Sequence, residues 1–532
     1  MKKVKLLALM ALLVCVMAGV VLVSSPVAPV VGGPVEVETL WEIEDTREES
    51  WDPLVTRLEN NGVPLSYDKE SNTFYCSIGL ENGDAWPQLH LTAPGAKGVS
   101  IVFSDDYSYD ACADAVAEGY EYELMAYSDT QYSYFYIVFT GLPVVSLYTQ
   151  SEITLEEQQG RFALGTAADG GLSCDALVRL RGDGSLYETE KLGYRVAFRN
   201  NRRNAMREVP GMGVLETVNF VSMAFDETLM HDKLSWDLIG RMKQEEEPFR
   251  ARKTQYVELF VNDAYAGVYL MMEPIDYETE IGKAGSGALL QDALYRTTVV
   301  DKVRSNAVIP GHQTWGYELF YSPDTKNLFS HLETYIALRD TEDDAEFTRL
   351  ALEHVDMKSA LGYCAFLQCA GLVDNVQNNM FIWAHTQNGK VTYRFLPWDM
   401  DRAWGMNAGG DYQHWSVFPV ADRLLNLDIG DARRVLADVW DEMKVRGMNV
   451  ETIEALVAGY EHELNDSGAA LRNAYRWETG MADGTALLEF FEARTELFEN
   501  ALADMLENEG PVSFLSEEPY ADWQIYVDMP LE

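Results

Sequence analysis

Apolar and polar residues first alternate in short runs, over about residues 41–140. The runs at 73–79, 99–103 and 132–139 are rich in aromatic and β-branched residues. Gly, Asn, Asp and Pro separate them at short intervals, as turns do between short strands. We predict a small β-sandwich over 41–140. The Pro- and Gly-rich segment 26–40 is predicted to be a linker.

The pattern changes twice more along the chain. Residues from about 141 to 325 keep strand-like runs, including a hairpin at 254–270, and one helical stretch lies near 226–243. After about residue 325 the apolar residues recur with the 3.6-residue period of a helix. The segments with this period are 344–356, 357–373, 431–445, 451–475 and 484–507.

One β-hairpin interrupts these helices, with strands at 381–384 and 391–396 around an Asn-Gly turn. The predicted fold class is α+β. It has an N-terminal β-sandwich, a β-rich lobe at about 141–325, a helical lobe at about 326–510 and a C-terminal tail at 511–532. Two unlike lobes in succession favour a ligand cleft between them.

The N-terminus predicts where the protein works. Lys2, Lys3 and Lys5 precede an uncharged apolar run at 6–23, followed by small residues. This is the layout of a secretory signal, predicted at residues 1–25, with a signal anchor as the alternative. We expect a secreted or cell-surface protein whose mature chain has no transmembrane segment. Its cysteines form no CxxC pair, which argues against a cysteine zinc site.

The charge excludes one class of partner. The chain has 41 Lys and Arg against 85 Asp and Glu, a net charge of −44. A surface this acidic repels phosphate backbones, so we expect no nucleic-acid partner. It attracts basic partners and divalent cations, although solubility alone would also account for it.

The densest polar constellation combines two carboxylate segments. Asp374 and Asn379 lie five residues apart after a predicted helix, and Asp399 and Asp401 follow the second strand of the hairpin. Phosphoryl transfer needs carboxylate and amide oxygens for Mg²⁺ and an acidic group that orients the nucleophile. Asp and Asn also form turns, so the first pair alone has a structural alternative.

Four ordered motifs resemble those of the spore-coat protein H (CotH) kinase family. The most specific is Pro-Trp-Asp-Met-Asp-Arg-Ala-Trp-Gly at 397–405. The others are the strand at 142–147, the pair of elements at 178–185 and 191–195, and the hairpin at 261–273. The resemblance covers about residues 142–480 and leaves the N-terminal region outside.

The resemblance implies an atypical protein kinase that uses ATP with Mg²⁺ or Mn²⁺. It makes Asp374 the catalytic-loop aspartate and Asp399 the principal metal ligand, with Asp401 in support. Asn379 is the metal-binding asparagine by spacing, and Asn378 is the alternative. The residues implied to contact nucleotide are Lys191, Arg181, Gly182, Gly184 and Ser185 at the phosphates, and Met272 and Glu273 at a hinge.

Two departures from the family pattern leave other functions open. Asp183 places a carboxylate near the proposed phosphates, and Leu192 replaces a second lysine. The first interpretation is a kinase for Ser or Thr of secreted, spore or cell-surface proteins, with a Ser-rich basic substrate suiting the charge. The second is a weak or inactive surface scaffold, and the third a glycoside hydrolase. The N-terminal region is open to a protein or a carbohydrate ligand. Lys191 and Glu273 also have structural alternatives, as a strand-end lysine and an ion-pair partner.

Overall fold

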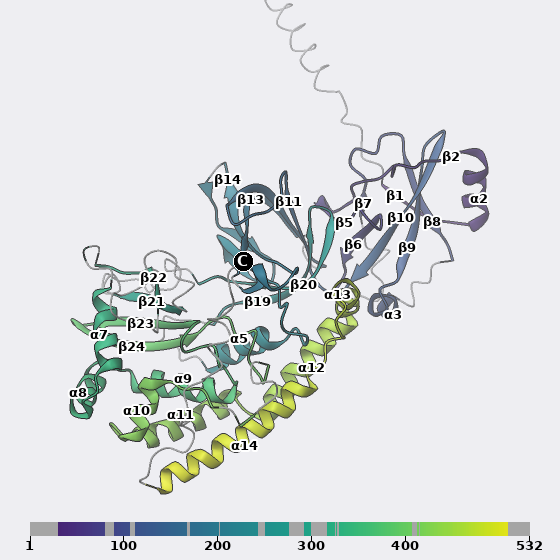
Figure 1. Ribbon diagram of the computed structural model, residues 1–532. Coiled ribbons are helices and arrows are strands. Elements are labelled where there is room, and N and C mark those ends of the chain that lie inside the picture. The colour runs from purple at the N-terminus through teal and green to yellow at the C-terminus, as the bar shows by residue number, and fades with distance from the viewer. Residues whose placement is uncertain are drawn as a thin grey trace, which may run out of the picture.

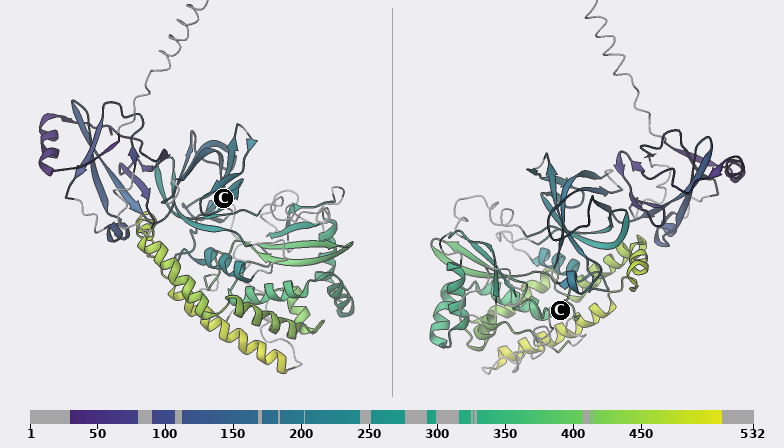
Figure 2. Two further views of the ribbon diagram at one scale, coloured as in Figure 1. Left: turned by 180° about the vertical axis from the view of Figure 1, so that it is seen from behind. Right: turned by 45° about the horizontal axis from the view of Figure 1, so that its top comes forward.

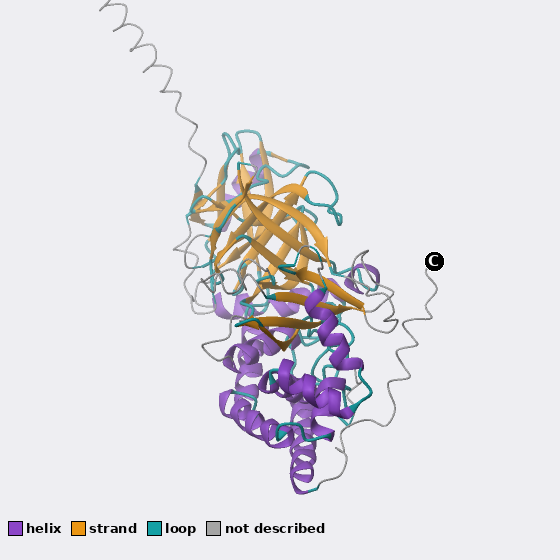
Figure 3. Ribbon diagram, turned by 90° about the vertical axis from the view of Figure 1, so that its left-hand side faces the viewer, coloured by secondary structure: helices purple, strands orange, loops and turns teal. Residues whose placement is uncertain are grey.

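The computed structural model describes most of the chain between residues 30 and 508. The described ranges are 30–79, 90–106, 112–167, 171–182, 184–201, 203–242, 251–275, 292–298, 316–324, 326, 329–406, 412–413 and 415–508. The predicted signal peptide and C-terminal tail lie outside them. The fold is mixed α+β, and strand-rich regions precede a helical one (Figures 1 and 3).

The N-terminal region is built on one large mixed sheet. Its elements are β1 (Val31–Val35), α2 (Val37–Thr46), β2 (Glu48–Glu49), β3 (Glu59–Asn60), β4 (Val63–Pro64), β5 (Ser66–Asp68), β6 (Thr73–Ser77), β7 (Leu91–Thr92), β8 (Ser100–Ser104), α3 (Cys112–Ala117), β9 (Glu121–Tyr127) and β10 (Gln131–Thr140). The seven-stranded sheet has the order β1-β8-β9-β10-β6-β5, with β2 on β10, and β4-β3-β7 form a separate small sheet.

The segment predicted as a linker is partly regular structure. Residues 31–35 form β1, which pairs in parallel with β8, and α2 begins at Val37. Gly32, one of the residues that suggested a flexible linker, instead allows β1 to pack closely against β8. A Cβ atom on Gly32 would lie 2.7 Å from the carbonyl oxygen of Ile101. The N-terminal sheet therefore starts about ten residues before the predicted boundary.

The second region is a strongly curved sheet (Figure 3). Its elements are β11 (Val144–Thr149), β12 (Gln158–Gly165), β13 (Leu172–Arg181), α4 (Gly184–Tyr187), β14 (Gly193–Asn200), β15 (Arg203–Asn204), β16 (Arg207–Val209), β17 (Gly213–Leu215), β18 (Thr217–Val221), α5 (His231–Met242), β19 (Thr254–Val261) and β20 (Ala264–Met272). The order is β13-β12-β11-β19-β20-β18-β14-β15, and β13 also pairs with β14. That pairing closes the sheet on itself around a core that includes Phe162, Val196 and Phe220.

The third region packs helices against a four-stranded sheet of order β22-β21-β23-β24. Its elements are β21 (Ala293–Thr298), β22 (Gly316–Tyr321), α7 (Ser330–Asp340), α8 (Asp344–His354), α9 (Met357–Cys369), β23 (Met380–Gln387), β24 (Lys390–Pro397), α10 (Pro419–Asn426), α11 (Ala432–Arg446), α12 (Val450–Asp466), α13 (Ala469–Trp477) and α14 (Thr485–Glu507). One apolar core joins these helices to α5 and to parts of β18–β20.

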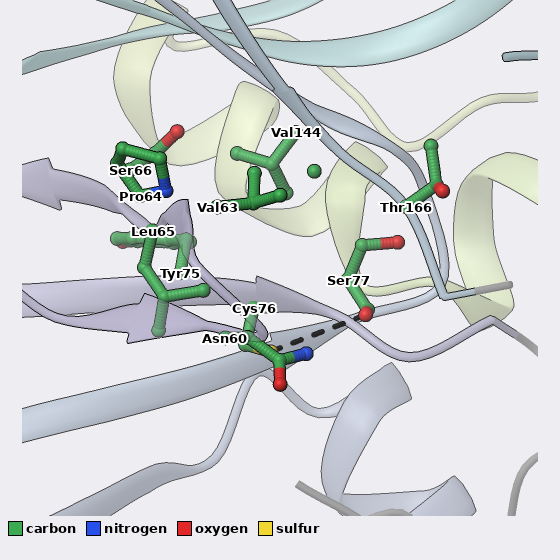
Figure 4. A pocket seen from close by; sticks show the side chains of 11 residues that line it. Asn60, Val63, Pro64, Leu65, Ser66, Tyr75, Cys76, Ser77, Val144 and Thr166 are labelled. Carbon is green, nitrogen blue, oxygen red and sulfur yellow. Dashed lines mark hydrogen bonds between the residues drawn. The ribbon is translucent and has the colours of Figure 1, made fainter. Parts of the chain in front are cut away.

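Helix α13 lies where the N-terminal region meets the closed sheet (Figures 1 and 2). Arg472 makes two hydrogen bonds to the buried carboxylate of Glu258 in β19, and its guanidinium lies over the ring of Tyr75 in β6. Ser66 and Ser146 share a hydrogen bond across the same boundary. Strand ends from both regions line a small pocket there (Figure 4). The N-terminal region is thus packed onto the remainder of the chain.

Candidate functional site

The loop after α9 carries Asp374. One carboxylate oxygen of Asp374 accepts hydrogen bonds from the side-chain amides of Asn378 and Asn379, at 3.1 and 3.2 Å. Asn379 adopts a left-handed backbone with φ of 56°, which asparagine tolerates better than most residues. The residues that the sequence placed five positions apart are therefore in direct contact.

The β23–β24 hairpin returns the chain to this loop. The amide of Trp398 donates to the carbonyl oxygen of Asn379 at 2.9 Å, and the Asn375 side chain donates to the carbonyl of Trp398 at 2.6 Å. Asp399 follows directly, exposed to solvent and with a φ of 59°. The hairpin predicted from the sequence therefore brings the Asp399 segment beside the Asp374 loop.

The N-terminus of α5 holds the other side of the Asp399 segment. The buried carboxylate of Asp232 accepts the amide of Met400 at 3.0 Å, and a ring nitrogen of His231 lies 2.8 Å from the carbonyl oxygen of Asp401. The indole of Trp404 donates to the carbonyl of His231. His231 and Asp232 were not predicted from the sequence. They lie about 170 residues before the segment that they contact in the folded chain, and no local pattern indicates that contact.

Four charged groups interact closely at this point. Desolvation lowers the pKa of Arg181, at the end of β13, while Asp399 and Asp232 oppose that shift. Burial and the charge of Asp399 raise the pKa of Asp232 to about 7. The same two causes raise the pKa of Asp401 well above its ordinary value. The site therefore combines three carboxyl groups with one partly buried guanidinium whose charges influence one another.

The donors present suit a hard divalent cation. Carboxylate and amide oxygens are the groups that Mg²⁺ prefers, and Mg²⁺ in kinases is held by one or two carboxylates plus substrate phosphates. Within the described ranges, no three His, Cys, Asp or Glu side chains converge on one point. Asp399 is exposed and follows Trp398, whose amide is bonded to Asn379, so the chemistry of these two oxygen donors is compatible with a metal whose other ligands come from phosphate.

Lys191 lies apart from this cluster. It is buried, and its ammonium donates to the side-chain oxygen of Asn473 at 3.0 Å and lies 5.2 Å from the ring centre of Tyr269. Desolvation lowers its pKa to about 7, opposed by the charge of Asp226. Its described contacts include neither the predicted catalytic aspartate, Asp374, nor the predicted metal ligand, Asp399, so a role of Lys191 at the phosphates stays a prediction.

Three of the remaining predicted nucleotide contacts follow β13. Gly182 follows β13 with a φ of 108°, a conformation that favours glycine. Gly184 and Ser185 begin the short helix α4, and Asp183 lies outside the described residues. Their roles at the phosphates stay predictions.

The predicted hinge residues end β20. Met272 pairs with both neighbouring strands, opposite Asn219 and Thr254. The amide of Glu273 donates to the carbonyl of Lys253 at 2.9 Å. The backbone groups of these buried residues thus serve the sheet, and an adenine contact stays a prediction.

Comparison with known families decides the relationship. The model of the family described as CotH kinase protein matches residues 178–497, which is more than half of the chain. The chain belongs to the CotH kinase family. The match confirms the resemblance drawn from the motifs and contains every predicted site residue.

The N-terminal sheet and strand β11 precede the residues matched to the CotH kinase family. A search of curated proteins finds no significant match. Among the described helices, none has the length and apolar character needed to cross a bilayer.

Proposed function

We propose that this CotH kinase family member is an extracytoplasmic phosphotransferase. It would transfer the γ-phosphoryl group of ATP to Ser or Thr of a secreted, spore or cell-surface protein. The observation that carries the proposal is the hydrogen bond between Trp398 and Asn379, which sets Asp399 beside the loop of Asp374. Phosphoryl transfer needs these two functions, metal binding and nucleophile orientation, in adjacent positions.

Each residue has a task that follows from its surroundings. Asp399 is exposed and offers an anionic oxygen, and Asn379 adds a neutral one, so together they would hold the metal. The bound metal would neutralise charge on the phosphates. Asp374 is half-buried, is oriented by the two asparagine amides that donate to one of its oxygens, and would accept the proton of the acceptor hydroxyl.

The location of the site supports a two-lobed interpretation. Arg181 comes from the closed sheet, whereas Asp374 and Asp399 come from the helical region, and the charge of Asp399 acts on Arg181. A nucleotide bound at Asp399 would therefore touch both regions. The two lobes of a protein kinase, one strand-rich and one helical, enclose ATP in the same way.

The place of action and the substrate class rest on the sequence. The basic, apolar and small-residue layout of the first 25 residues favours export. The net charge of −44 favours a basic protein acceptor, because it attracts such a partner over long range. ATP and a divalent metal are the cofactors that this activity requires.

A second candidate is a CotH-type scaffold with little or no catalytic activity. Two features favour it: the N-terminal region that lies outside the family match, and the carboxylate of Asp183 in the proposed phosphate loop. The glycoside hydrolase interpretation is weaker. Asp399 and Asp401 lie on one segment, whereas hydrolysis needs two carboxylates on opposite sides of a sugar.

The test is calorimetric ATP binding to the mature chain, with and without Mg²⁺ or Mn²⁺. The proposal predicts metal-dependent binding that Asp399→Ala abolishes. A matched control is Asp438→Ala, an exposed aspartate on α11 that pairs with Arg434. Equal affinity in Asp399→Ala and wild type would refute the metal site. Absence of ATP binding by the wild type would favour the scaffold.

A further inference from the structure

Asn473 is a buried polar side chain that links two distant parts of the fold. Its side-chain oxygen accepts the ammonium of Lys191 at 3.0 Å and the backbone amide of Val268 at 3.0 Å. Lys191 precedes β14 and Val268 belongs to β20, whereas Asn473 lies in α13, 282 residues after Lys191. A single amide oxygen thus connects the lysine to both the helix and the sheet.

The surrounding fold fixes this oxygen in place. The indole of Trp477, one turn later in α13, donates to the carbonyl of Ala266 at 2.9 Å. Gly267 has a φ of 107°, and a Cβ atom there would lie 2.7 Å from both the Asn473 oxygen and the Trp477 indole nitrogen. The missing side chain at Gly267 lets α13 approach the strand closely enough for Asn473 to reach Lys191.

The partner of the buried lysine is uncharged. A buried lysine is normally paired with a carboxylate, since an isolated ammonium is costly to bury. Among the described residues, the charged or titratable groups that act on Lys191 are Asp226, through its charge, and Tyr269, through its ring. Asp226 already accepts hydrogen bonds from the amides of Leu229 and His231. Burial raises the pKa of Tyr269 well above its ordinary value, so that phenol is neutral.

We propose that Asn473 is the positioning residue of Lys191, holding its amine with a neutral acceptor so that phosphate oxygens can compete for it. This inference rests on the proposed function for the role of Lys191 at the nucleotide. A carboxylate at position 473 would keep the lysine permanently charged and bound to α13. A neutral amide holds the amine more weakly and allows it to gain or lose a proton near neutral pH.

The test measures the titration of Lys191 directly. Lysine labelled with ¹³C at Cε during expression reports each amine by NMR without modifying it, and Lys191→Arg assigns the signal. Wild-type Lys191 should titrate near pH 7. Asn473→Asp should raise that midpoint by about one unit or more, because a carboxylate stabilises the ammonium. Asn473→Leu should lower it, because the ammonium loses its acceptor.

Tyr475→Asp is the matched control, since it adds a carboxylate to the exposed face of the same helix. It should leave the Lys191 midpoint unchanged. The proposal is supported if the Lys191 midpoint is highest with Asp at position 473, intermediate with Asn and lowest with Leu. If only one of the two variants folds, it is compared with wild type alone. A Lys191 midpoint equal to that of wild type in every variant that folds would overturn the proposal.

ATP binding gives the second readout. Asn473→Asp should weaken metal-dependent ATP binding about ten-fold or more, because its carboxylate competes with the phosphates for the amine. Unchanged affinity would overturn the positioning role. The NMR order does not depend on catalysis. The predicted order of midpoints can therefore be observed even if the wild type binds no ATP. That combination of results would refute the proposed function but not the contact between Asn473 and Lys191.

Discussion

Trp398 and Asn379 meet through their backbones, with the amide of Trp398 donating to the carbonyl oxygen of Asn379 at 2.9 Å. Asn379 ends the Asp374 loop and Trp398 precedes Asp399. This one hydrogen bond thus sets the spacing between the proposed base and the proposed metal ligand. The buried side chain of Asn375 supports it by donating to the carbonyl of Trp398.

Asn375→Ala should therefore destabilise the fold around the site. The carbonyl of Trp398 would lose a buried hydrogen-bond donor, a cost of about 1–3 kcal/mol in the free energy of unfolding. Urea denaturation followed by fluorescence measures this change. The control is Asn508→Ala, which changes an exposed asparagine at the end of α14. Asn388 is unsuitable because its φ of 55° would strain an alanine. Equal stability of Asn375→Ala and wild type would mean that this bond does not hold the segment.

Arg472→Ala should destabilise the junction of the N-terminal region with the closed sheet. The side chain of Glu258 has no exposed surface, so loss of Arg472 leaves a buried carboxylate without its cation. Breaking such a pair costs about 3–5 kcal/mol. Arg434→Ala removes an exposed pair on α11 and should cost less than about 1 kcal/mol. Similar thermal denaturation of the two variants would contradict the described packing of α13.

Lys191→Met should flatten the pH dependence of stability above neutral pH. The unfolded chain keeps the lysine proton up to about pH 10.5, whereas the folded state releases it near pH 7. Folding therefore expels a proton between these values, and the free energy of unfolding of the wild type rises with pH there. The methionine variant lacks this contribution. Asp422, whose pKa burial raises to about 8, contributes equally to both proteins and cancels in their difference.

Denaturant titrations of both proteins at pH 7, 8 and 9 provide the measurement. The free energy of unfolding of the wild type should rise relative to that of Lys191→Met as the pH rises. A constant difference across this range would show that Lys191 titrates at its ordinary value, and that its burial by Asn473 and Tyr269 is not as described.

Local sequence signals predicted the hairpins and most helices. Gln387, Asn388 and Gly389 marked the turn between β23 and β24. Asn388 and Gly389 have φ values of 55° and 77°, as a tight hairpin turn requires. That turn is decided by neighbouring residues alone, so the Asp399 segment could be placed beside the Asp374 loop from the sequence.

Contacts between distant residues explain what the sequence did not predict. The apolar period predicted one helix over 451–475, but the chain breaks into α12 and α13 at Gly468. Gly468 has a φ of 71°, and a Cβ atom there would collide with the carbonyl of Val116 in α3. The close approach of Val116 to Gly468 places this break against the N-terminal region, a contact that the apolar period does not report.

The N-terminus of α5 gives a second example. Asp226 was predicted to begin a helix, yet the helix starts at His231. The carboxylate of Asp226 instead accepts the amides of Leu229 and His231 across the preceding turn. Asp232 then reaches the amide of Met400, 168 residues away. Periodicity within one segment carries no information about such a partner.

Radiolabel transfer from γ-labelled ATP is the most direct test of the proposed activity. It is measured on wild type and Asp374→Asn with Mg²⁺ or Mn²⁺ and a Ser-rich basic protein acceptor. The wild type should transfer label, and Asp374→Asn should bind ATP within a few-fold of wild type. The variant should transfer label about 10²-fold more slowly, because the amide keeps the size of the carboxylate but cannot take the proton. A wild type that binds ATP but transfers no label to itself or to the acceptor with either metal would contradict the kinase assignment.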